Sequence, residues 1–271
     1  MNLNTLYHKT QDWKTTPKMP VLFLGHGSPM NAIADNQFVQ GFKKVAKQIP
    51  EPKAILCVSA HWETRGTKVT AMDMPRTIHD FGGFPKELYE VQYPAPGNPI
   101  LADETAKVLA PIAVDMDYEW GLDHGAWSVI KHLYPKANIP TIQLSLDYNR
   151  SPKAHFELAK QLEVLRHKGV LIVGSGNIVH NLRRLNFGKN AVYDWAIEAR
   201  HIINQHLMDR DFYRLFNYHN NTALQLAIPT PEHFLPLLYS LAVCNAKSDN
   251  ISLFNDEVVM GSISMTSLFI G

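Results

Sequence analysis

One short stretch constrains the fold of this chain more than any other, and it reads PVLFLGHGSPM over residues 20–30. Its four consecutive apolar residues, 21–24, are typical of a strand that is buried on both faces. Glycines on both sides of His26 then let the backbone turn sharply. In open α/β sheets, ligands bind just beyond the carboxyl ends of such strands. We therefore expect the His26 imidazole at the functional edge of a sheet.

Other segments repeat this design further along the chain. The apolar run AILCVSA over residues 54–60 leads directly to His61, and the run VLIVG over residues 170–174 leads to SGNIVHN, which contains His180. A further turn, DHGAW, places His124 next to a glycine before a predicted helix. Because parallel strands end at the same edge of a sheet, we expect these histidines to border one crevice.

The alternation of helical and strand patterns predicts one α/β domain. At 271 residues with 45% hydrophobic content, the chain can bury a large core. We predict a single three-layer α/β/α domain over residues 1–271, with a central, mostly parallel mixed sheet and a polar N-terminal arm over residues 1–19. Apolar spacing predicts helices over residues 38–49, 100–109, 155–168 and 191–217, and further strands over 68–72, 112–116, 139–146 and 257–270.

Composition and charge exclude several classes of function. The formal net charge is +1, from 26 basic and 25 acidic residues without a long run of either sign, so no nucleic-acid or membrane-surface partner is expected. Two cysteines are too few for a disulfide framework, and Cys57 lies in an apolar run that favours a reduced, packed thiol. The N-terminal residues lack the apolar core of a signal peptide, and no apolar run reaches about 18 residues. We therefore expect a cytoplasmic protein.

Residues 75–99 form the longest irregular segment, PRTIHDFGGFPKELYEVQYPAPGNP. Its proline, glycine and aromatic content prevents it from being one regular element. Connections of this length inside a compact domain are more often binding loops than spacers. We expect this segment to border the functional site.

Five of the thirteen histidines lie where ligands are usually bound. Each follows a predicted strand, opens a predicted helix or sits in a glycine turn. Four or five imidazoles at one crevice indicate a metal site with acid/base groups. A hydrogen-bonded structural role is about as probable for any single one of them, but less so for all together. The five are His26, His61, His124, His180 and His233.

The remaining histidine patterns support no zinc-protease motif. His201 and His206 are five residues apart and would face different sides of a helix, so the HExxH arrangement is absent. Thr230 and Pro231 predict a helix N-terminus, which would place His233 in the first helical turn. There the helix dipole disfavours a charged imidazolium and leaves a neutral ring that can bind a cation.

Seven motifs in order carry a resemblance to a known family: GHGSPM, SAHW, TIHDFGGFP, YPAPG, DHGAW, SGNIVHNL and PTPEHFLPLLY. Over nearly the whole chain they resemble the bacterial 4,5-DOPA extradiol dioxygenase-like proteins, within the class III extradiol ring-cleaving dioxygenases. The resemblance implies one α/β domain, a non-haem Fe(II) site and opening of a catechol such as L-DOPA beside its hydroxyl pair. The implied product is a muconic semialdehyde.

The resemblance also implies a metal-ligand set. His26 of GHGSP and His61 of SAHW correspond to the two metal-binding histidines of the family. The third ligand of protocatechuate-type members is a glutamate, and here His233 takes its place. Glu232 is the rival, but adjacent residues of a helix point about 100° apart, so only one of them would face the metal. An all-histidine set departs from the usual two-histidine, one-carboxylate triad and suits Zn(II) as well as the Fe(II) expected for activity.

By the same resemblance, His180 corresponds to the acid/base histidine of the superfamily and could also reach the metal, and His124 to a second histidine near substrate and oxygen. The implied partners are a small catechol and O2, and the protein would be a monomer or a homodimer. Arg65, Arg76 and Arg183 are candidates for binding a substrate carboxylate.

Two alternatives stay open from the sequence. A zinc hydrolase built on the same histidines would need a carboxylate base beside the metal-bound water, and Glu63, Asp123 or Glu232 would supply it. A non-catalytic metal- or ligand-binding protein would keep the scaffold without the chemistry. An open coordination position facing a pocket distinguishes a catalytic site from a closed structural one.

Overall fold

The computed structural model describes residues 16–188 and 191–271. Most of the N-terminal arm expected over residues 1–19 therefore lies outside the described residues. Within its last four residues, the Thr16 amide donates to the carbonyl of His167 (2.7 Å), and the Met19 amide donates to the carbonyl of Arg166 (2.9 Å). This short segment thus runs beside the chain that leads into a central strand.

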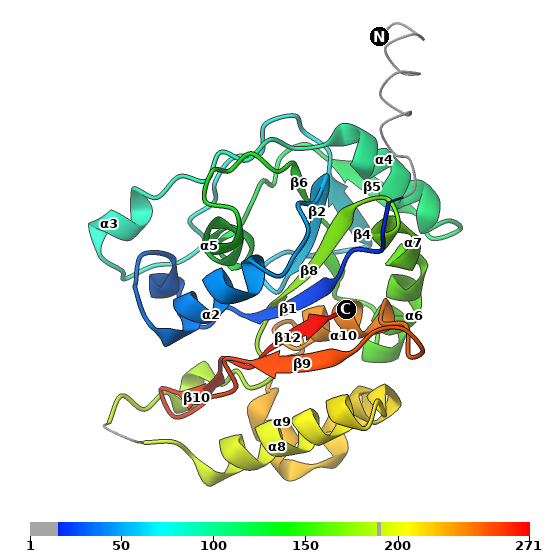
Figure 1. Ribbon diagram of the computed structural model, residues 1–271. Helices are drawn as coiled ribbons and strands as arrows, with labels where there is room; N and C mark the ends of the chain where they lie inside the picture. The colour runs from blue at the N-terminus through cyan, green and yellow to red at the C-terminus, as the bar shows by residue number, and fades with distance from the viewer. Residues whose placement is uncertain (1–15, 189–190) are drawn as a thin grey trace, which may run out of the picture.

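A six-stranded mixed sheet forms the centre of the molecule (Figure 1). Its first four strands pair in parallel, and the last two add antiparallel strands at one edge. The predicted mostly parallel mixed sheet is therefore confirmed. Its strands, in spatial order, are β6 (Thr141–Gln143), β2 (Ala54–Ser59), β8 (Val170–Gly176), β1 (Val21–Gly25), β12 (Ser267–Ile270) and β9 (Ile251–Phe254).

Helices cover both faces of this sheet and complete three layers (Figure 1). Successive strand residues point to opposite faces, so Leu22 packs in one apolar core and Phe23 in the other. Helices α2 (Gln37–Ala46) and α5 (His124–Leu133) cover the Leu22 face. The Phe23 face is covered by α4 (Pro99–Val108), α6 (Pro152–Ala159), α7 (Glu163–Arg166), α8 (Asp194–Met208), α9 (Thr222–Ala227) and α10 (Leu235–Ala242).

Smaller elements surround the main layers. Three two-stranded ladders lie outside the sheet. They pair β3 (Glu63–Thr64) with β7 (Leu146–Asp147), β4 (Thr67–Thr70) with β5 (Val114–Asp117), and β10 (Val258–Val259) with β11 (Ile263–Ser264). The short helical turns are α3 (Lys86–Tyr89), η1 (Pro29–Ala32), η2 (Lys160–Leu162), η3 (Leu182–Arg184) and η4 (Phe212–Asn220).

Two predicted elements begin or end differently in the structure. The helix expected to start at Thr230 begins only at Leu235 as α10, because the Thr230 hydroxyl donates to Oε1 of Glu232 (2.9 Å) instead of capping a helix. His233 therefore lies in a turn before the helix, and the dipole argument does not apply to it. The helix expected over residues 191–217 ends at Met208, and Arg210 follows with a left-handed backbone (φ 57°).

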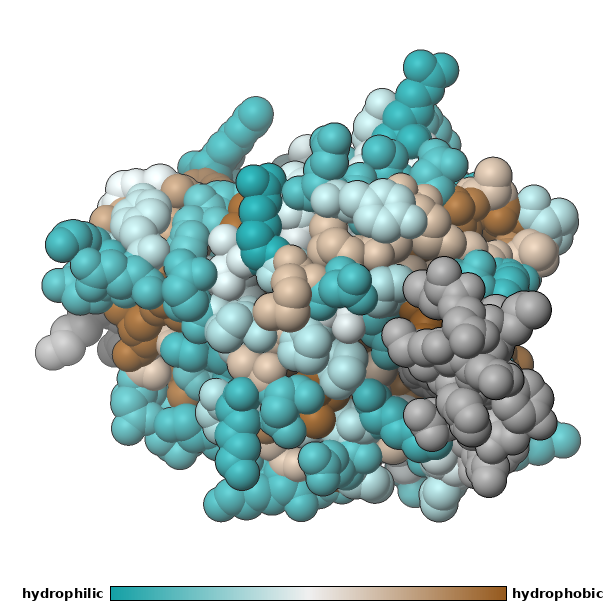
Figure 2. Space-filling view, turned by 90° about the horizontal axis from the view of Figure 1, so that it is seen from above, coloured by the Kyte–Doolittle hydropathy of each residue, from teal (hydrophilic) through white to brown (hydrophobic). Residues whose placement is uncertain are grey.

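Among the described residues, none of the helices has the length and apolar character needed to cross a bilayer. The face seen in Figure 2 is covered largely by hydrophilic residues, and hydrophobic residues appear there in separate patches. Large exposed apolar side chains include Leu182 and Phe187, which are 60% and 78% exposed. Both border the cavity described below.

Candidate metal centre and active site

Three neighbouring parallel strands deliver three of the histidines. His26 directly follows β1, His61 lies two residues beyond β2, and His180 lies four residues beyond β8. Strand β8 lies between the other two, and its register places Gly176 opposite Gly25 and Ser175 opposite Ser59. The three strands therefore end at the same level, as expected from the sequence.

The other two histidines come from helical segments on opposite faces of the sheet. Asp123 caps α5 by accepting a hydrogen bond from the Ala126 amide (3.0 Å), which makes His124 the first residue of that helix. His233 is held in the turn before α10, where its carbonyl accepts a hydrogen bond from the Asn177 amide (2.8 Å). The start of α5 and the turn before α10 thus each bring an imidazole to the carboxyl ends of the strands.

All five predicted histidines lie together. The ring centroids of His26, His61 and His233 form a near-equilateral triangle with sides of 5.0, 5.0 and 5.3 Å. His124 lies 3.9 Å from His61, and His180 stacks on His233 at 3.5 Å. The three predicted ligands thus have their rings close together, with His124 next to His61 and His180 next to His233.

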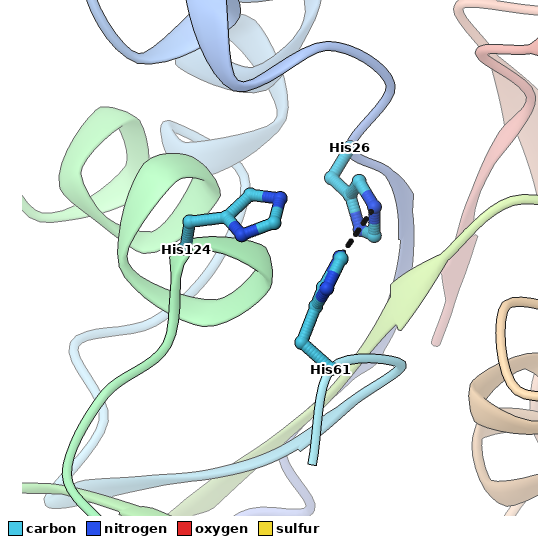
Figure 3. Close-up of side chains that lie close together, drawn as sticks. All are labelled: His26, His61 and His124. Atoms are coloured by element: carbon cyan, nitrogen blue, oxygen red, sulfur yellow. Dashed lines mark hydrogen bonds between the residues drawn. The ribbon is translucent and has the colours of Figure 1, made fainter. Parts of the chain in front are cut away.

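The closest pair of ring nitrogens has the spacing of two metal ligands. Nε2 of His26 lies 3.3 Å from Nε2 of His61, and Figure 3 shows the two rings facing each other at the ends of their strands. Two imidazole nitrogens on one tetrahedral zinc, at about 2.0–2.1 Å each, are separated by about 3.3 Å. A metal ion can therefore be placed between these two rings without moving them.

Hydrogen bonds fix the tautomer of His26. Its Nδ1 atom lies 3.0 Å from Oγ of Ser175, and that hydroxyl donates its own proton to the carbonyl of Gly125 (2.6 Å). Oγ of Ser175 must then accept a proton from Nδ1 of His26. The Nε2 atom of His26 consequently carries a lone pair, which is the state that metal binding requires.

The Glu232 carboxylate contacts the His233 ring at its Nδ1 atom. Its Oε1 atom lies 3.0 Å from Nδ1 of His233, so the carboxylate holds the proton on that nitrogen and leaves Nε2 with a lone pair. This is the carboxylate–histidine arrangement found around metal centres. Glu232, the alternative to His233 as third metal ligand in the sequence analysis, therefore contacts the His233 ring through one of its oxygens.

Asp80 is a site residue that the sequence reasoning missed. Its Oδ1 atom accepts a hydrogen bond from the backbone amide of His124 (2.8 Å). Its Oδ2 atom lies 3.0 Å from Nδ1 of His124 and 3.4 Å from Nδ1 of His61. Both rings therefore present Nε2 on the side away from the carboxylate. The available signal was its place within TIHDFGGFP, in the segment predicted to be a binding loop.

The binding loop is fastened to the start of α5. The amide of Ile78 donates to the carbonyl of Leu122 (2.7 Å), and the Leu122 amide donates to the carbonyl of Arg76 (2.8 Å). The indole of Trp127 donates to the carbonyl of Ile78 (2.7 Å). These three bonds hold Asp80, two residues further on, at a fixed distance from the histidines.

Two glycines permit this close packing. A Cβ atom on Gly125 would lie 2.4 Å from Oγ of Ser59 and 2.6 Å from the His61 ring. A Cβ atom on Gly176 would lie 2.1 Å from the carbonyl oxygen of His233. Only glycine at these positions lets α5 and the His233 turn approach the strand ends.

At the level of single ligand atoms, the site divides into two groups of three. One contains His26, His61 and His124, and the other contains His180, Glu232 and His233, each with its ligand atoms within 4.8 Å of one another. The predicted ligand set therefore draws members from both groups. Carboxylate oxygens lie near Nδ1 of His61, His124 and His233, so the Nε2 atoms of these rings are available to a metal, and imidazole donors suit Fe(II) or Zn(II).

Burial favours the neutral form of His26, His61, His180 and His233 by lowering the pKa of each ring. It lowers the pKa of His26 and His233 well below the usual value, and the neighbouring histidines lower it further. Burial also lowers the pKa of His61 to about 3 and that of His180 to about 4. For Asp80 burial alone would raise the pKa, but hydrogen bonding and attraction from His124 hold it below the usual value. At neutral pH the site thus contains neutral metal donors beside a carboxylate.

A cavity of about 350 Å³ opens beside the histidines, and all five line it. None of the three candidate arginines is among its described lining residues. Arg76 donates through Nε to the carbonyl of Trp120 (3.0 Å), and Arg183 lines an adjoining cavity. The expectation that one of them meets a substrate carboxylate in this cavity therefore has no support in the described residues.

The carboxylates considered for a hydrolase lie elsewhere. Asp123 is buried, accepts from the hydroxyl of Ser59 (2.6 Å) and caps α5, and neither it nor Glu63 lines the cavity. Asp80 lines the cavity and lies 3.0 Å from Nδ1 of His124, and Glu232 lines the adjoining cavity with one oxygen 3.0 Å from Nδ1 of His233.

The chain matches one protein family over residues 15–264, described as the catalytic LigB subunit of aromatic ring-opening dioxygenase. It is 46% identical over 262 residues to a protein of Escherichia coli (strain K12) named 4,5-DOPA dioxygenase extradiol, covering 95% of this chain and 96% of that protein. A protein of Beta vulgaris with the same name is 36% identical over 256 residues, covering 90% and 96%.

One solved structure has a similar fold over most of its length. The crystal structure of an uncharacterized protein from Escherichia coli K12 superposes with a TM-score of 0.82 at 42% sequence identity. The match covers 94% of this chain and 100% of that one. The mixed α/β architecture is therefore shared over nearly the whole chain.

Proposed function

This chain belongs to the LigB family of aromatic ring-opening dioxygenases and is an extradiol dioxygenase, and we propose that it opens a catechol such as L-DOPA by 4,5-cleavage. Both atoms of O2 would enter the product, a muconic semialdehyde. The observation that carries the proposal is the facing pair of Nε2 atoms of His26 and His61, 3.3 Å apart at the wall of a cavity. A metal between them would be open to that cavity, as catalysis requires.

We further propose that His26, His61 and His233 hold the metal, as Fe(II) in the active enzyme, with Zn(II) also accepted by the donor set. When bound, Fe(II) supplies the reaction with O2 and lowers the pKa of the catechol hydroxyls. The proposal for His233 is supported by its position in the triangle of rings and by Glu232 on its Nδ1 atom. This ligand set contains no carboxylate. Two carboxylates, Asp80 and Glu232, instead lie beside Nδ1 atoms of the histidines.

In this proposal His180, beside His233, and His124, beside His61, handle protons. His180 lines the cavity as a neutral imidazole, because burial keeps its pKa at about 4, and it would accept a hydroxyl proton from the bound catechol. His124 has Asp80 on its Nδ1 atom, so its Nε2 atom would hydrogen-bond to substrate or oxygen. The rest of the cavity would orient the ring and exclude water.

Anaerobic loading with Fe(II), followed by oxygen-uptake measurement, tests this proposal. We expect one O2 consumed for each catechol opened, with the visible absorbance of a semialdehyde appearing at the same rate. The zinc-loaded form, assayed with aryl esters and amides, is the control for the hydrolase alternative. Ester hydrolysis by that form, without oxygen uptake on any catechol by the iron form, would overturn the proposed activity.

A further inference from the structure

A second cavity adjoins the active-site cavity. It measures about 290 Å³, and the walls of both cavities include His180, Leu182 and His233. The rings of His180 and His233 stack with their centroids 3.5 Å apart, so the adjoining cavity borders both a proposed metal ligand and the proposed base. A substituent on a ring that is held in the active-site cavity is thus within reach of the second cavity.

The two cavities differ in the charge of their walls. Apart from the histidines and Asp80, the active-site cavity is lined largely by aromatic and aliphatic side chains. The adjoining cavity instead contains charges of both signs, from the guanidinium of Arg183 and the carboxylate of Glu232. The first cavity suits an aromatic ring, and the second suits a substituent that carries both a negative and a positive charge.

The Arg183 guanidinium is available to a ligand. The side chain is exposed and lines the adjoining cavity, and within residues 16–188 and 191–271 no group forms an ion pair or hydrogen bond with it. Arg166, by contrast, is occupied by Asp249 and by the carbonyl oxygens of Met19 and Val243. A guanidinium matches a carboxylate with two parallel hydrogen bonds. A substrate carboxylate in this cavity would therefore find a partner of suitable geometry.

Two oxygen atoms in the wall of the same cavity are left for a cation. Oε1 of Glu232 accepts from the Thr230 hydroxyl (2.9 Å) and lies 3.0 Å from Nδ1 of His233, whereas Oε2 has no donor among the described residues. Asn181 is only 6% exposed, and its amide nitrogen donates to the carbonyl of Leu226 (2.7 Å). Its Oδ1 atom is buried without a partner in the described part of the chain. Both oxygens favour a positively charged group in this cavity.

We propose that the adjoining cavity binds an α-amino-acid group on the catechol, with Arg183 on its carboxylate and Glu232 beside its ammonium group. The inference rests on the proposed function and deepens it, because L-DOPA carries both of these groups. Arg183 is then a specificity-determining residue that favours catechols with an anionic substituent. The unpaired Oδ1 atom of Asn181 adds to the attraction for the ammonium group.

Four catechols that differ in charge test the role of Arg183. L-DOPA carries a carboxylate and an ammonium group, 3-(3,4-dihydroxyphenyl)propanoate only the carboxylate, dopamine only the ammonium group, and 4-ethylcatechol neither. We expect Arg183→Met to lower kcat/KM of the Fe(II) enzyme at least about tenfold for the two carboxylates, because a hydrogen-bonded charge pair is lost. The values for dopamine and 4-ethylcatechol should stay within about twofold, since an exposed charge has little effect without a partner.

Arg184→Met is the matched control. Arg184 is the next residue in the chain, is also exposed and lines neither of the two cavities, so this variant removes the same charge away from the ligand. All four of its kcat/KM values should equal those of the unaltered enzyme. Arg183→Lys should restore part of the loss, and only for the two carboxylates. Equal losses of Arg183→Met for all four catechols, or undiminished values for both carboxylates, would overturn the assignment.

Calorimetric binding to the zinc-loaded enzyme gives a readout that needs no turnover. L-DOPA should bind the unaltered protein at least about tenfold more tightly than Arg183→Met, whereas 4-ethylcatechol should bind both equally. If this difference is found but no catechol is opened, the proposed function fails and the amino-acid subsite is supported. Equal binding of L-DOPA by the two proteins, or binding by neither, would overturn the subsite, while oxygen uptake decides separately on ring cleavage.

Discussion

Nε2 of His26 lies 3.3 Å from Nε2 of His61. The hydrogen bond from Nδ1 of His26 to Ser175 leaves Nε2 of that ring without a proton. Asp80, beside Nδ1 of His61, favours the same tautomer in the second ring. Both nitrogens then offer a lone pair at the spacing of two ligands of one metal ion, and a metal that binds only the folded state stabilises the fold.

We therefore expect metal to stabilise the folded protein. Zinc added to the chelator-treated protein should raise the free energy of unfolding by about 2.7 kcal/mol at one hundred times the dissociation constant. Thermal unfolding with and without zinc measures this, with Mg²⁺ as the control cation that imidazoles bind poorly. An unchanged Tm would contradict a metal site at this position.

Loss of the Ser175 hydroxyl should weaken metal binding. In Ser175→Ala, Nδ1 of His26 loses its acceptor, the ring is no longer held as the Nδ1-protonated tautomer, and we expect zinc affinity to fall about tenfold. Competition with a chromogenic chelator measures the affinity. Ser240→Ala is the matched control, because Ser240 is equally buried and donates to the carbonyl of Leu22 (2.9 Å), away from the site. Equal affinities for the two variants would refute the role of Ser175.

The identity of the third ligand can be decided by metal content. We expect His233→Ala to lose most of its bound zinc, because only two histidine ligands remain. His124→Ala should keep it, because His124 is proposed to contact substrate or oxygen. Atomic absorption after dialysis against a weak chelator measures both variants. The opposite pattern would favour the atom-level group of His26, His61 and His124 as the ligand set.

Removal of His180 should separate metal binding from turnover. We expect His180→Ala to retain its metal and to lose at least about a hundredfold in kcat, the usual contribution of a positioned general base. Oxygen uptake and metal analysis on the same sample give both quantities. His201→Ala, at an exposed position on α8, controls for the loss of one imidazole. Undiminished ring opening would exclude His180 from proton transfer, and loss of metal would make it a ligand.

The metal-free protein should lose stability as the pH falls. His61 and His180 have folded-state pKa values of about 3 and about 4, below about 6.5 in the unfolded chain, so the unfolded state takes up protons first. Stability is complete above pH 6.5, and each such histidine lowers the unfolding free energy by about 1.4 kcal/mol per pH unit below that.

Urea unfolding between pH 7 and 5 measures this slope. His180→Gln should show a shallower slope, whereas His201→Gln, altered at an exposed position, should match the unaltered protein. A flat profile for the unaltered protein over this range would mean that folding does not lower the pKa of the buried histidines.

Local sequence signals were sufficient for the elements that carry the site. The apolar runs before His26, His61 and His180 predicted three buried strands, and β1, β2 and β8 lie there. Strands of this kind can be predicted from the sequence because a strand buried on both faces needs an unbroken apolar run. The same strand pattern predicted that the histidines border one crevice, and the family motifs added the roles proposed for each of them.

The orientation of the side chains was decided by tertiary structure. Asp80 reaches His61 and His124 because a distant loop is bonded to the start of α5, and Ser175 meets His26 because two strands pair in a particular register. Contacts of this kind join residues far apart in the chain, so no local pattern encodes them. The sequence alone determined which imidazoles would gather at the sheet edge. Only the packing of the strands and helices determined which nitrogen of each ring faces a metal, because that depends on the partner behind the ring.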